Sequence, residues 1–197
     1  MLTALIARGA DVPGHYVLHG VMEVGSELLL NPDGTFEYML AYGAADYWAK
    51  GTWRLEDNSV VLNSAGKKEA PFSFLRSEAG NPAKVCVWVI GKNGQGVENI
   101  QVKLQTADQH LEATTTSDGA AVFPDAINPR AVSFEVPVYS IKAGPFAINR
   151  TDHGFYFEIN GDAITEVLFK DEPLAIEGNN LMMKYWSKDQ PMRYEKY

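Results

Sequence analysis

Apolar and polar residues alternate with a period of two along the first third of the chain. After the turn sequence that begins at Asn31 (Asn-Pro-Asp-Gly), one face of the next segment carries Phe36, Tyr38 and Leu40. Polar or small residues fill most of the positions between them, and residues 47–55 repeat the alternation. This period is typical of strands with one buried face, and the Asp-Gly pair favours a tight turn. The pattern therefore predicts an antiparallel meander of five or six strands over residues 15–77.

The middle of the chain has shorter alternating runs, separated by Gly and Asp turns. This spacing predicts a small antiparallel β-sandwich. The predicted strands are residues 85–90, 100–105, 110–115, 120–123 and 132–136. About four more strands are expected over residues 141–197. Residues 163–169 have room for one helical turn at most, so the chain is predicted to be all-β.

Two stretches of the middle segment have a recognisable pattern. "VIGKNGQGVENIQVKLQ" places Gly94 and Gly96 in a hairpin turn, and "ATTTSDGAAVF" places a turn at Asp118 and Gly119 before Phe123. Together they resemble the carboxypeptidase regulatory-like, or transthyretin-like, domain over residues 84–138. The small residues after Gly119 depart from the family, which usually has a larger residue there. The resemblance implies an immunoglobulin-like accessory sandwich and is nearly silent on function.

The first meander carries a second, weaker pattern. It reads LxLxxDGxF followed, after a loop, by GxW, at positions Leu28, Leu30, Asp33, Gly34, Phe36, Gly51 and Trp53. This arrangement resembles lipocalin-like β-barrels and the envelope lipoproteins linked to copper resistance. The chain has neither their lipid-anchored cysteine nor a cysteine pair for a soft metal, so copper chemistry is not carried over. The resemblance implies a barrel and an exported protein.

These patterns suggest a domain organisation. Residues 15–80 and 140–197 are expected to form one β-meander body, a lipocalin-like barrel or sandwich. Residues 83–138 are then an inserted transthyretin-like sandwich, since insertions are tolerated at loop tips. Three consecutive pieces are the alternative arrangement. Residues 1–14 are interpreted either as the remnant of a secretion signal or as a short N-terminal strand or helix.

Composition narrows the function classes. Apolar residues make up 46% of the 197 residues and charged residues 21%, which predicts a packed globular protein. The net charge is −8 and Lys and Arg do not cluster, so nucleic acid is not an expected partner. The longest apolar runs fall far short of a transmembrane segment. The single cysteine, Cys86, lies in an apolar strand pattern and is expected to be a buried thiol.

The usual signatures of catalysis and metal binding are weak. His15 and His19 share a strand face about 13 Å apart, too far for one metal ion. The chain has no G-x-S-x-G motif, and "GKNGQG" lacks the ending of a phosphate-binding loop. We therefore predict no catalytic residue, no metal and no cofactor. Carboxylates are abundant, so a hydrolase that uses Glu23 and Glu37 is kept as the alternative.

Aromatic residues are the strongest candidates for a binding function. Several lie near the loop "AYGAADYW", and the predicted ligand-binding set is Tyr38, Tyr42, Asp46, Tyr47, Trp48 and Trp53. The tail contributes Met182, Met183, Trp186 and Met192, either to the core or to a contact surface. We predict a non-enzymatic binding or interaction protein of the bacterial envelope, periplasmic or secreted, that holds a small ligand, glycan or peptide. A structural subunit of an envelope assembly and a cytoplasmic location are the alternatives.

Overall fold

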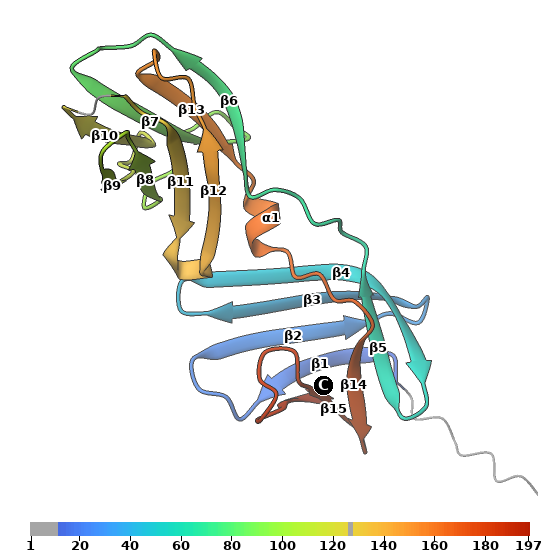
Figure 1. The fold of residues 1–197 in the computed structure, drawn as a ribbon. Coiled ribbons are helices and arrows are strands. Elements are labelled where there is room, and N and C mark those ends of the chain that lie inside the picture. The colour runs from blue at the N-terminus through green and yellow to red at the C-terminus, as the bar shows by residue number, and fades with distance from the viewer. Residues whose placement is uncertain (1–11, 126–127) are drawn as a thin grey trace, which may run out of the picture. The chain divides into compact units, whose positions relative to one another are not determined.

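The computed structural model describes residues 12–125 and 128–197, and it is all-β as the alternation predicts. Eight strands of the described chain close into an antiparallel barrel. Around the barrel the order is β1 (Gly14–His19), β16 (Met192–Lys196), β15 (Asn180–Met183), β14 (Glu172–Glu177), β5 (Ser59–Ser64), β4 (Ala45–Glu56), β3 (Thr35–Tyr42) and β2 (Val24–Leu30). Strands from both ends of the sequence thus complete one sheet: β16 pairs with β1, and β14 pairs with β5, dark red beside green in Figure 1.

The period of two decides which side chains fill the barrel. In β3, Phe36, Tyr38 and Leu40 are buried inside, and the residues between them face outward. The strands β2, β1 and β16 contribute Leu28, Tyr16 and Tyr194 to the same interior in the same way. The barrel interior is therefore a packed core along most of its length.

The Asn-Pro-Asp-Gly turn has a structural role that extends beyond its own hairpin. Gly34 has φ of 84°, a conformation that is cheap only for glycine, and Asp33 accepts hydrogen bonds from the backbone and side chain of Thr35. Trp53, on β4, donates its indole N–H to Asn31 O at 2.9 Å and its backbone N–H to Gly34 O at 2.8 Å. The separated DG and W positions of the sequence pattern thus meet at one end of the barrel.

A second compact unit, residues 69–164, is a β-sandwich. One sheet has the order β10 (Ala120–Pro124), β7 (Lys84–Gly91), β13 (Gly154–Ile159) and β6 (Phe72–Glu78). The other has the order β12 (Ile141–Ala147), β11 (Ala131–Val136), β8 (Gln101–Gln105) and β9 (His110–Thr114). Phe72 and Phe157 of the first sheet pack on Phe134 of the second, with ring centroids 4.4 and 4.8 Å from Phe134. A 3₁₀ turn (Pro137–Tyr139) and the helix α1 (Gly161–Thr165) complete the elements.

The structure places the unit boundaries differently from the expected 83–138 and 15–80 plus 140–197. The barrel unit comprises residues up to Lys68 and from Thr165 onward, and residues 69–164 are inserted between β5 and β14. The inserted unit is wider because three strands expected in the body, β6, β12 and β13, belong to it: β13 pairs with both β6 and β7, and β12 pairs with β11. The strand pattern alone does not show which sheet a strand joins.

The two chain segments that connect the barrel to the insertion lie side by side at the barrel. Ser64 donates its backbone N–H to Phe169 O at 2.9 Å and its hydroxyl to Val167 O at 3.0 Å. Both segments also bond to β4, through Lys50 O and Trp48 O. Of the N-terminal segment 1–14, residues 1–11 lie outside the described chain. Val12 is buried in the barrel core, where its carbonyl accepts the Tyr16 hydroxyl proton at 2.6 Å.

Candidate binding site at the barrel mouth

The six predicted ligand-binding residues do not share one surface. Tyr38 is inside the barrel, and Trp53 secures the turn at one end. Trp48 lies on the outer face, where its indole N–H donates to Thr165 Oγ1 at 3.1 Å. Asp46 is an exposed residue near the start of β4. Tyr42 and Tyr47 line a hollow at the opposite end of the barrel from Trp53, which we call the mouth.

The mouth is a hollow of about 510 Å³ where β1 ends and β2 begins. Tyr42, Tyr47 and Trp186 supply aromatic walls, and the rings of Tyr47 and Trp186 have centroids 4.9 Å apart. The remaining apolar lining consists of Val21, Val24, Leu40, Pro191 and Met192. Small-molecule sites are commonly concave, mainly apolar and of this size, so the mouth has the properties of a ligand site.

A buried hydrogen-bond network holds the floor of the mouth. The Trp186 indole N–H donates to the Tyr38 hydroxyl at 2.7 Å, and the hydroxyl oxygens of Tyr38 and Tyr194 are 3.4 Å apart. Ser26 gives its single hydroxyl proton to Met39 O at 2.6 Å, so Tyr194 donates to Ser26 Oγ across 2.8 Å. Burial raises the pKa of both Tyr38 and Tyr194, so both hydroxyls stay protonated at neutral pH. Tyr38 does not line the hollow, and it holds Trp186 in position from inside the barrel.

Polar groups are few at the mouth and lie at its rim. Ser187 and Gln190 belong to the loop between β15 and β16, and His19 and Arg193 face each other in the register of β1 and β16. Glu195 binds Arg193, with Oε1 3.0 Å from Nη2, and its other oxygen is 4.0 Å from His19 Nε2. The mouth thus combines an apolar interior with hydrogen-bonding groups at one edge.

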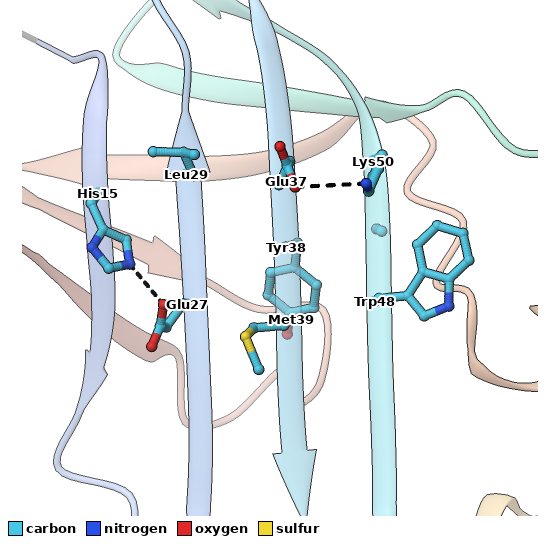
Figure 2. Close-up of a pocket in the computed structure, with 9 residues that line it drawn as sticks. His15, Glu27, Leu29, Glu37, Tyr38, Met39, Trp48 and Lys50 are labelled. Carbon is cyan, nitrogen blue, oxygen red and sulfur yellow. Dashed lines mark hydrogen bonds and ion pairs between the residues drawn. The ribbon is translucent and has the colours of Figure 1, made fainter.

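A second hollow, also of about 510 Å³, is a groove on the outer face of β1 to β4. Figure 2 shows Leu29, Met39 and Trp48 along it. His15 and Glu27 form one ion pair at 2.8 Å, and Glu37 and Lys50 form another at 3.7 Å. Because the charged side chains of the groove are paired with one another, they attract a charged ligand only weakly. Its apolar side chains Leu29 and Met39 are exposed.

The carboxylates proposed for a hydrolase lie far apart. Glu23 is in the turn before β2, next to Val24, which pairs with Tyr42 of β3. Glu37 is five residues before Tyr42 on β3, a separation of about 16 Å along a strand. Catalytic carboxylate pairs in glycosidases are about 5 to 9.5 Å apart, so Glu23 and Glu37 do not form such a pair. Glu37 is moreover engaged by Lys50.

Other chemistry has little support in the described chain. Residues 12–125 and 128–197 contain no group of three His, Cys, Asp or Glu side chains placed to hold a metal ion. Cys86 is buried in β7, and burial raises the pKa of its thiol, which disfavours the reactive thiolate. Among the described residues, no helix is long and apolar enough to cross a membrane.

Comparisons with known proteins give no relative from which to transfer a function. No family model, no curated protein and no solved structure matches the chain. The mouth and the outer groove are therefore the features of the barrel from which a function can be inferred.

Two of the six residues predicted from the sequence, Tyr42 and Tyr47, line the mouth, and the sequence left the tail residues undecided between core and contact surface. Met183 and Met192 belong to the core, and Met192 also lines the mouth beside Trp186. Ser187 and Gln190 carried no sequence signal, because a loop of polar residues between two strands is ordinary. Only closure of the barrel brings this loop next to β1, β2 and β4.

Proposed function

We propose that the barrel unit is a non-enzymatic binding module that holds a small, largely apolar molecule at its mouth. The observation that carries this proposal is the hollow of about 510 Å³ walled by Tyr42, Tyr47 and Trp186. A flat ring system placed between these aromatic side chains would gain both apolar burial and ring contacts. The hydrogen bond from Trp186 to Tyr38 supports the proposal, because it holds one wall in place before a ligand arrives.

The experiment is a fluorescence titration with N-phenyl-1-naphthylamine, a neutral probe that brightens in apolar sites. Tyr42→Ala removes one exposed wall without touching the packed core, since Tyr42 is 57% exposed. We expect this variant to bind the probe about fivefold more weakly, which corresponds to losing roughly 40 Å² of apolar contact. Met39→Ala is the matched control, because Met39 is 50% exposed and lies in the outer groove. Equal affinity in wild type and Tyr42→Ala would refute the proposal.

A second function, docking of a protein partner, is favoured by the outer groove. Leu29 and Met39 are exposed there next to Trp48, and exposed apolar patches often mark interaction surfaces. Affinity capture with wild type and Met39→Asp tests this function, and a partner retained equally by both proteins would argue against the groove.

Two further parts of the proposal concern the setting and the inserted unit. Two packed four-stranded sheets support assigning residues 69–164 to a transthyretin-like accessory domain. An envelope location has the N-terminal sequence resemblance as its support. Cell fractionation of the tagged full-length protein tests that location, and recovery in the cytoplasmic fraction alone would contradict it.

A further inference from the structure

The charge at the mouth narrows the class of ligand, an inference that rests on the proposed function. Acidic residues outnumber basic ones by 25 to 17 in the whole chain. Among the described residues that line the mouth, however, the only side chains able to carry charge are His19 and Arg193. None of these described lining residues carries a carboxylate. The hollow is therefore lined by basic side chains, and the carboxylate that pairs with them, Glu195, lies outside the lining.

Arg193 keeps donors available despite its ion pair. Glu195 occupies Nη2 at 3.0 Å, whereas a guanidinium has five N–H donors. The Arg193 side chain is 54% exposed, so its other donors are accessible to a ligand. Ser187 and Gln190 add neutral hydrogen-bonding groups on the same rim.

The outer groove provides an internal comparison. It has about the same volume, but its charges are two complete pairs, His15 with Glu27 and Glu37 with Lys50. At the mouth, by contrast, the two basic side chains His19 and Arg193 share a single carboxylate, Glu195, which lies outside the lining, and three aromatic rings stand beside them.

From this arrangement we infer that the ligand of the mouth is an amphipathic organic anion. Its ring system packs between Tyr42, Tyr47 and Trp186, and its carboxylate, sulfonate or phosphate lies at the rim against Arg193. Such an anion accepts charge-assisted hydrogen bonds from the guanidinium, while the apolar body leaves water.

Two probes with the same ring skeleton test this inference on the full-length protein. 8-Anilinonaphthalene-1-sulfonate carries a sulfonate, and N-phenyl-1-naphthylamine does not. We expect wild type to bind the sulfonate about tenfold more tightly, as one charge-assisted contact provides. Arg193→Gln should remove most of that preference, because it weakens binding of the sulfonate far more than binding of the neutral probe. Arg54→Gln is the matched control, since it removes the same charge from the barrel at a position outside the mouth, paired with Glu56 and Asp171.

The outcomes separate this inference from the proposed function. If both probes bind equally and Tyr42→Ala weakens both, the mouth is a ligand site but the anion inference is wrong. If the preference for the sulfonate is equal in Arg193→Gln and Arg54→Gln, the inference is also wrong, because the effect is then one of overall charge. If Tyr42→Ala changes the binding of neither probe, the proposed site itself fails.

Discussion

The hydrogen bond between Trp186 and Tyr38 gives the sharpest prediction about how the mouth is built. Tyr38→Phe removes the hydroxyl that accepts the Trp186 indole N–H at 2.7 Å and leaves the aromatic ring in place. Little volume is lost, so the loss of stability comes mainly from the indole N–H that is left without an acceptor. An unsatisfied buried donor costs about 1–3 kcal/mol. Because Trp186 is only partly buried, solvent can satisfy its indole N–H in part, and we expect the free energy of unfolding to fall by about 1–2 kcal/mol.

Tyr194→Phe is the matched control for this change. It removes a hydroxyl from the same network, but Ser26 keeps its own hydrogen bond to Met39 O. We therefore expect Tyr194→Phe to cost about 1 kcal/mol and to leave Trp186 anchored. The two variants should differ in function: Tyr38→Phe should weaken binding of N-phenyl-1-naphthylamine several-fold, and Tyr194→Phe should leave it nearly unchanged.

The assay is equilibrium urea denaturation followed by circular dichroism, with a double-mutant cycle between Tyr38→Phe and Trp186→Phe. The cycle should give a coupling energy of about 1 kcal/mol, because either single change already breaks the bond. A coupling energy near zero would refute the assignment of this bond. Equal loss of probe affinity in Tyr38→Phe and Tyr194→Phe would refute the idea that Tyr38 positions Trp186.

Three further predictions concern the barrel itself. Gly51→Ala should lower the free energy of unfolding by at least about 2 kcal/mol, because the new Cβ would overlap the β5 backbone. Gly25→Ala is the control: a Cβ there meets nothing within 4 Å, so the same urea titration should show almost no change. Replacing residues 69–164 by a short Gly-Ser linker should leave a folded barrel with wild-type probe affinity, since the two connecting segments lie side by side. A circular dichroism spectrum without the β-sheet signal would contradict this. Above pH 10, the ordinary tyrosine pKa, the unfolded chain releases the protons of Tyr38 and Tyr194 while the folded barrel keeps them, so stability should fall by up to about 2.7 kcal/mol per pH unit. Stability measured at pH 9 and pH 11 tests this, and the double Phe variant should show a much flatter decline.

The sequence predicted local structure better than it predicted which segments meet. Alternation in β3 correctly separated the buried Phe36 and Tyr38 from the outward residues, because burial on one face of a sheet imposes a period of two. The same pattern cannot say which sheet a strand joins. Residues 72–78 directly follow the barrel strands of the first third of the chain, yet β6 pairs with β13 in the inserted unit.

The candidate site shows the same contrast between what a local pattern predicts and what long-range pairing decides. Tyr42 and Tyr47 were found because aromatic residues near a turn stand out in the sequence. Trp53 stands out equally, but its indole N–H is committed to Asn31 O in a turn 22 residues away. Trp186 joins the mouth only because β16 pairs with β1, which closes the barrel between the two ends of the chain. Such long-range pairings depend on the whole fold and leave no local signal.

The most direct test of the central claim is a titration of methionine-methyl-labelled protein with N-phenyl-1-naphthylamine, followed by NMR. The two hollows each contain one methionine, with Met192 at the mouth and Met39 in the outer groove. We predict that the Met192 methyl resonance shifts in a saturable way and that the Met39 resonance does not move. A saturable shift of Met39 with Met192 unchanged would contradict the account and move the binding site to the outer face of the barrel.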